Sequence, residues 1–108
     1  MDEEIEVLPW DVALEALARE TSQRKGRGLR LNDIRSLSRE HRIRFDDFMV
    51  TLFELVLAGR WHYLDRHSGR PVFFDRATLE GLYVRGRLRE EDLQDFDGYW
   101  VPGPAPAQ

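Results

Sequence analysis

The sequence predicts one α+β domain that is mainly helical, and three observations lead to this fold class. Apolar residues recur at helical spacing up to residue 58, and after Gly59 they alternate as they do in strands. The chain has 108 residues, of which 42% are apolar and 33% charged, as in a single soluble globular domain. We expect an acidic lead over 1–9, a helical and hairpin domain over 10–75, a C-terminal extension packed on it over 76–101, and a flexible tail over 102–108.

Two helices are expected before the clearest helical segment. Pro9 suits the first turn of a helix over about 10–22, and the segment QRKGRG, 23–28, should end it. Asn32 is a suitable N-cap for a second helix over about 33–41. The apolar positions at helical spacing are Trp10, Leu14, Leu17 and Ala18 with Thr21 in the first helix, and Ile34 and Leu37 in the second.

The segment 45–58 has the clearest helical pattern. Asp46 and Asp47 in its first turn suit the positive end of a helix dipole, and Gly59 suits a left-handed residue that stops a helix. Six apolar residues recur three, four or seven positions apart, which places them on one face. They are Phe45, Phe48, Met49, Leu52, Leu55 and Val56.

A β-hairpin is expected directly after Gly59. Trp61 and Tyr63 alternate with His62 and Leu64, and the segment DRHSGR, 65–70, offers turn residues before a returning strand. Pro71 lacks an N–H donor and therefore suits the start of an edge strand. The returning strand is expected at Val72, Phe73 and Phe74.

The C-terminal extension is expected to contain a turn over 77–84 and a helix over about 87–96. Leu88 and Leu93 should make its contacts with the body, on which Tyr99, Trp100 and Val101 should also dock.

Three helices followed at once by a two-stranded hairpin is the element order of a winged-helix domain. In this fold the third helix packs across the first two, and the hairpin covers the open end of the core. The predicted core consists of Leu14, Leu17, Ile34, Leu37, Phe48, Met49, Leu52, Leu55 and Val56 with Trp61.

The run FDDFMVTLFELVLAGRWHYLD, 45–65, resembles the C-terminal winged-helix domain of kleisins, especially the kleisin subunit of the bacterial SMC condensin complex. In that family a Leu-rich helix end is followed by a small residue, Gly and an alternating strand. Here the run 52–56 and Gly59-Arg60 occupy those places, and the likeness covers 31–75. Asp65 departs from the family's usual Gln, the hairpin loop is longer, and the chain continues after the hairpin.

The resemblance implies a protein–protein interaction module without chemistry of its own, which docks on an SMC ATPase head during chromosome condensation and segregation. One feature of the sequence is compatible with such docking: the third helix carries further apolar residues off its main face. Either a partner or the C-terminal extension must cover these residues. Self-association through exposed apolar residues would also cover them. The expected partner-binding residues are Val50, Phe53, Leu57, Trp61, Tyr63 and Phe73.

The alternative is a winged-helix DNA-binding protein, such as a transcriptional regulator. Residues 19–44 carry nine Lys or Arg against three acids, and the hairpin loop adds more arginines. The acids Asp46, Asp47 and Glu54 on the third helix oppose this reading, because they would repel phosphates. Pairing of the basic segment with acidic parts of the chain is the simpler explanation of its charge. The candidate nucleic-acid-binding residues are Arg24, Lys25, Arg27, Arg30, Arg35, Arg39, Arg42, Arg66 and Arg70.

No residue pattern indicates catalysis or a bound cofactor. His62, His67 and Asp65 lack the spacing of an established metal site, and Asp46-Asp47 diverge around a helix. The segment Gly26-Arg27-Gly28 lacks the context of a phosphate loop. We therefore predict a non-enzyme with neither metal nor cofactor. An acidic start, no long apolar run and no cysteine favour a cytoplasmic protein, which the resemblance would associate with the nucleoid.

Overall fold

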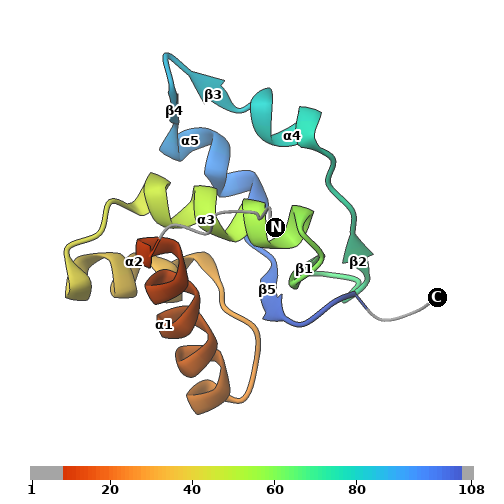
Figure 1. Ribbon diagram of the computed structural model, residues 1–108. Helices are drawn as coiled ribbons and strands as arrows, with labels where there is room; N and C mark the ends of the chain where they lie inside the picture. Colours follow the sequence, from red (N-terminus) through yellow and green to blue (C-terminus); the bar gives the residue numbers. More distant parts are fainter. Residues whose placement is uncertain (1–8, 106–108) are drawn as a thin grey trace, which may run out of the picture.

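The computed structural model describes residues 9–105. Three helices form the first half of the domain (Figure 1). They are α1 (Pro9–Lys25), α2 (Leu31–His41) and α3 (Phe45–Leu57). Most of the predicted acidic lead and the end of the predicted tail lie outside the described residues. No helix within 9–105 has the length and apolar character needed to cross a membrane.

The first helix is longer than its predicted range of 10–22. It continues through the first three residues of the expected breaker, because Gln, Arg and Lys are good helix formers. The chain leaves the helix only at Gly26, whose φ of 70° few other residues adopt without strain.

The second helix starts earlier than predicted, and Asn32 is not its N-cap. Arg30 is the N-cap, and its backbone N–H donates to the Asp33 carboxylate at 2.8 Å. This is one of the two bonds of a capping box, and the other is absent because an arginine side chain has no acceptor. Leu31 is buried in the core, so the first helical residue is fixed by packing as well as by the cap.

The third helix agrees with its predicted range to within one residue. Ala58 is its C-cap, and Gly59 follows with a φ of 76°, as the left-handed stop requires. Asp46 and Asp47 lie in its first turn, as predicted.

A three-stranded antiparallel sheet lies beside the helices, in the order β2–β1–β5. The predicted hairpin is formed by β1 (Trp61–Leu64) and β2 (Pro71–Val72), and β2 is an edge strand. Phe73 and Phe74 lie beyond the end of β2, contrary to the prediction. The docking predicted for 99–101 takes the form of a strand, β5 (Tyr99–Pro102), which pairs with the whole of β1.

The C-terminal extension differs from the prediction before it reaches β5. It contains α4 (Arg76–Glu80), a small hairpin of β3 (Tyr83–Val84) and β4 (Arg87–Leu88), α5 (Glu90–Leu93) and the 3-10 helix η1 (Gln94–Phe96). The predicted helix over 87–96 is therefore wrong in its first part. Arg85 and Gly86 both have positive φ, 55° and 79°, so they make a tight two-residue turn that was not foreseen.

From α4 to α5 the extension lies on the opposite side of α3 from α1 and α2, and β5 then returns to β1 (Figure 1). Leu79, Leu88 and Leu93 are buried there, which confirms the predicted contacts of Leu88 and Leu93. The molecule is thus a compact α+β domain in which α3 is central. Its radius of gyration, 13.6 Å, is close to the value of about 13 Å expected for a compact chain of this length.

The core confirms seven of the ten residues predicted from the sequence. Leu17, Leu55 and Val56 were predicted to be buried but are only half-buried. In their place Phe53 and Trp100 are fully buried, because the extension covers a second face of α3. The confirmed residues are Leu14, Ile34, Leu37, Phe48, Met49, Leu52 and Trp61.

A buried carboxylate joins α1 to the sheet. The indole N–H of Trp61 donates to Glu15 Oε2 at 3.2 Å, and Arg19 donates to the same oxygen at 2.8 Å. Arg60 Nη2 lies 2.8 Å from the other oxygen. Burial opposes the charge on Glu15, but the hydrogen bonds from Arg19 and Trp61 and the charge of Arg60 outweigh it and lower the pKa of this carboxyl.

The lowered pKa predicts a specific dependence of stability on pH. Because the folded pKa lies below the unfolded one, the Glu15 contribution is present above about pH 4.3 and is lost as pH falls through the folded value. Glu15→Gln should lower the free energy of unfolding by about 1–3 kcal/mol at neutral pH. In urea unfolding, the gap between the variant and the wild type should close toward pH 3. The exposed Glu20→Gln on the same helix is the control, and an equal gap at both pH values would contradict the proposed role of the charge.

Candidate interaction surfaces

The second apolar face of α3 is covered by the protein itself. Phe53 has 0% exposure and lies among three other aromatic rings. Its ring centroid is 5.1 Å from those of Phe74 and Phe96 and 5.0 Å from that of Trp100. Of the two coverings that the sequence left open for Phe53, the C-terminal extension is the one that the structure contains. The prediction that Phe53 contacts a partner is therefore wrong.

Two further predicted partner-binding residues are also buried. Trp61 and Tyr63 are 1% and 6% exposed, because β5 and α3 enclose the inward face of β1. The hydroxyl of Tyr63 accepts the Gly98 N–H at 2.7 Å. Burial raises the pKa of this phenol, so it stays protonated in the core. Val50 and Leu57 are half-buried and pack against the core, which leaves them little surface for a partner.

Phe73, the last of the six predicted partner-binding residues, is exposed on the hairpin. It is 70% exposed, and Val72 beside it on the edge strand is 38% exposed. A hollow of about 140 Å³ lies next to them, with His62 in its lining. We call this region the hairpin surface. The residues that line the hollow are Val56, Gly59, Trp61, His62, Val72, Phe73, Phe74 and Ala105.

The sequence contained a signal for this surface. Three consecutive apolar residues, Val72 to Phe74, cannot all face inward from one strand, because successive side chains point to opposite faces. At least one of them therefore had to leave the strand or face solvent. Which one does so depends on the tertiary contacts of Phe74 with Phe53 and Tyr63.

Most of the predicted nucleic-acid-binding residues are paired with acids of the same chain. Asp33 lies 2.7 Å from Arg27 and 3.6 Å from Lys25, and Asp97 lies 3.0 Å from Arg30 and 3.3 Å from Arg66. Arg35 pairs with Glu90. This agrees with the simpler explanation of the basic segment, although the acids come from α2 and the extension. Among the nine predicted residues, those without an ion pair to any described residue are Arg24, Arg39, Arg42 and Arg70.

The helix that would read DNA in a winged-helix protein is not free here. Asp46 and Glu54 on α3 each lie 2.7 Å from an arginine of the extension, Arg87 and Arg76 respectively. The acids that argued against DNA are thus neutralised, but the same contacts cover the helix. Binding to base edges through α3 is blocked in this structure.

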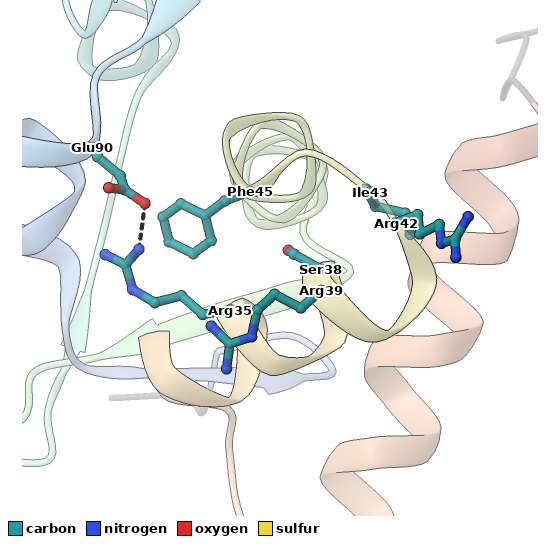
Figure 2. Close-up of a pocket in the computed structure, with 7 residues that line it drawn as sticks. All are labelled: Arg35, Ser38, Arg39, Arg42, Ile43, Phe45 and Glu90. Carbon is teal, nitrogen blue, oxygen red and sulfur yellow. Dashed lines mark hydrogen bonds and ion pairs between the residues drawn. The ribbon is translucent and has the colours of Figure 1, made fainter.

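A second hollow, of about 270 Å³, lies at the C-terminal end of α2 (Figure 2). The guanidinium of Arg35 lies 4.3 Å from the ring centroid of Phe45 and also pairs with Glu90. Figure 2 shows Arg35 and Arg39 extending along the same side of α2, while Arg42 extends the other way. We call this region the α2 hollow. Its lining residues are Arg35, Ser38, Arg39, Arg42, Ile43, Phe45 and Glu90.

Two features of the α2 hollow are energetically unfavourable for the protein alone. Ser38 is buried, and its hydroxyl has no hydrogen-bond partner among the described residues. Arg42, the C-cap of α2, has a φ of 58°, a left-handed conformation that costs a non-glycine residue about 1–2 kcal/mol. Glycine or asparagine would suit that position better.

Two of the three side chains considered as metal ligands, Asp65 and His62, have other partners. Asp65 accepts the backbone N–H groups of Ser68 and His67 at 2.8 and 3.0 Å, and these bonds lower the pKa of its carboxyl. His62 Nδ1 lies 2.8 Å from the Gly103 carbonyl oxygen. Within 9–105 no group of three or more His, Asp or Glu residues is placed to hold a metal ion.

Comparison of the chain with protein-family models, with curated proteins and with solved structures found no match.

Alanine substitutions at a buried and at an exposed phenylalanine test whether the extension covers α3. Phe53→Ala should lower the free energy of unfolding by about 3–5 kcal/mol, because it empties the centre of the aromatic cluster. Phe73→Ala removes the same side chain from an exposed position and should change it by no more than about 0.5 kcal/mol. Urea unfolding measures both. Equal effects would contradict the placement of the extension over α3.

Proposed function

We propose that this protein is a winged-helix domain that acts, without catalysis, as a protein-docking module. Its proposed partner is an SMC ATPase head, and its proposed contact is the hairpin surface. The observation that carries the proposal is the exposure of Phe73, 70%, beside an edge strand and an apolar hollow.

The order of the elements supports the winged-helix assignment. Three helices precede the β1–β2 hairpin, and Leu29 between α1 and α2 forms a short bridge with Trp100 of the sheet. The segment that resembles kleisins corresponds to α3, Gly59 and β1. The resemblance is what points to an SMC head and to a role in chromosome condensation and segregation.

The hairpin surface has the physical properties of a docking site. A large aromatic side chain that is exposed next to a hollow can fill a pocket on a partner, as interface anchors do. The outer edge of β2 is not paired with another described strand, so its backbone can bond to a strand of a partner. Arg70 and His67 at the hairpin loop would favour an acidic rim on that partner.

The test of docking is a substitution at the proposed anchor. Phe73→Asp should weaken binding to the purified ATPase head of the SMC protein from the same organism by tenfold or more, roughly the effect of losing an interface anchor. Isothermal titration calorimetry measures the change. Val84→Asp is the matched control, because Val84 is also exposed and apolar but lies on the β3–β4 hairpin.

Two results would contradict the docking proposal. One is a wild-type protein that does not bind the head. The other is binding that Phe73→Asp leaves unchanged while the variant remains folded.

Nucleic-acid binding is a second candidate, favoured by the arginines that have no partner among the described residues. With α3 covered, these residues could contact phosphates but not base edges. If DNA is bound, affinity for a random duplex should fall steeply as salt rises, and Arg24→Glu with Arg39→Glu should abolish it. A gel shift at low and moderate salt measures this, and no shift at low salt would remove the candidate. Docking through the hairpin surface should depend far less on salt.

A further inference from the structure

We propose that the α2 hollow is a binding site for a phosphate monoester dianion that carries an apolar group. The hollow holds about 270 Å³, and its lining contains three arginines, one serine and two apolar residues besides Glu90. None of these residues belongs to the hairpin surface, so the site is separate from the proposed docking function.

An oxyanion is already held in the hollow. The Glu90 carboxylate, which comes from the extension, pairs with Arg35 (Figure 2). The Glu90 side chain is 59% exposed, so it can turn to solvent and yield its place to a stronger anion. Arg39 and Arg42 have no ion pair with any described residue, which leaves two positive charges of the lining without an acid. These charges match the dianion of a phosphate monoester at neutral pH.

Ser38 provides an independent indication of a ligand. Its side chain lies in the wall of the hollow and is buried, yet its hydroxyl bonds to no described residue. Buried polar groups in proteins nearly always have a partner. Figure 2 shows the hydroxyl oxygen turned toward the side of Phe45. A phosphate oxygen that reached this hydroxyl would supply the partner that it lacks among the described residues.

The residue at the C-cap of α2, Arg42, is not the one that would stabilise the fold best. The C-cap of α2 adopts a left-handed conformation in which glycine or asparagine is usual. An arginine there has a conformational cost that no ion pair with a described residue offsets. Figure 2 shows its side chain extending away from Arg35 and Arg39, so it would have to turn to reach a bound anion.

The shape of the hollow favours a monoester over a nucleic-acid backbone. Ile43 and Phe45 form apolar walls, against which an organic group attached to the phosphate can pack. Glu90 at the rim would repel the continuous charge of a polynucleotide, whereas a single phosphate group needs only to displace it.

The experiment measures binding of inorganic phosphate, phenyl phosphate and a random DNA duplex to the full chain by calorimetry. Ionic strength is held constant with chloride, because phosphate also acts on protein surfaces non-specifically. The wild type is compared with Arg39→Gln, Ser38→Ala and Glu90→Gln. Arg24→Gln on α1 is the matched control, since Arg24 is an arginine without a described ion pair outside the hollow.

Phenyl phosphate should bind saturably and more tightly than inorganic phosphate. Arg39→Gln should weaken it about tenfold, the effect of losing one charged hydrogen bond. Ser38→Ala removes a hydroxyl without a described partner, so it should fold at least as well while binding more weakly. Glu90→Gln should bind more tightly, and Arg24→Gln should behave as the wild type. Phe73→Asp should also retain phosphate binding, which separates this site from the docking proposal.

The proposal is overturned if neither phosphate compound binds saturably. It is also overturned if all variants bind alike, which would indicate a non-specific charge effect. Binding of DNA that depends on Arg39, without binding of either phosphate compound, would replace it with a backbone contact.

Discussion

The attachment of β5 to the body is the constraint on which the rest of the structure depends. Trp100 pairs with Tyr63 in the sheet and exchanges two backbone hydrogen bonds of 2.9 Å with Leu29 between α1 and α2. Its ring is fully buried against Phe53. Beside it, Gly98 approaches β1 so closely that an added Cβ would lie 2.1 Å from the Leu64 carbonyl oxygen. One strand at the end of the chain thus closes the sheet and holds the extension over α3.

This attachment decides which surfaces are available for function. A helix that is apolar around much of its circumference needs cover on both sides, and here α1 and α2 provide one cover and the extension the other (Figure 1). Because both faces of α3 are covered, neither a protein partner nor the base edges of DNA can reach its apolar residues. Among the described residues, the most exposed large apolar side chain is Phe73, next to β2, and Arg39 and Arg42 at the end of α2 have no ion pair with another described residue. The two proposals of function therefore rest on parts of the domain at a distance from its centre.

The ion pairs between the extension and the helices specify the position of the extension, but they add little to the free energy of unfolding. Arg76 and Arg87 pair with Glu54 and Asp46 on α3, and Glu90 pairs with Arg35 on α2. Exposed pairs of this kind contribute little free energy each, about 0–1 kcal/mol. They do, however, disfavour other placements of a segment that has few long elements of its own. Ion pairs with described acids also engage six of the nine basic residues between 19 and 44, namely Arg19, Lys25, Arg27, Arg30, Arg35 and Arg44.

The sequence by itself determined the helices α1 to α3 and the hairpin, because these follow from local periodicity and from Gly59 and Pro71. It also identified most of the core. Only the tertiary structure decided that Phe53, Trp61 and Tyr63 are buried and that residues 99–102 form a strand. It also decided that Arg27 and Arg30 have acidic partners, whereas Arg39 and Arg42 have none among the described residues. Burial and ion pairing depend on contacts between residues far apart in the chain, such as Arg30 with Asp97. A local sequence pattern cannot predict which distant segment will pack against a given residue.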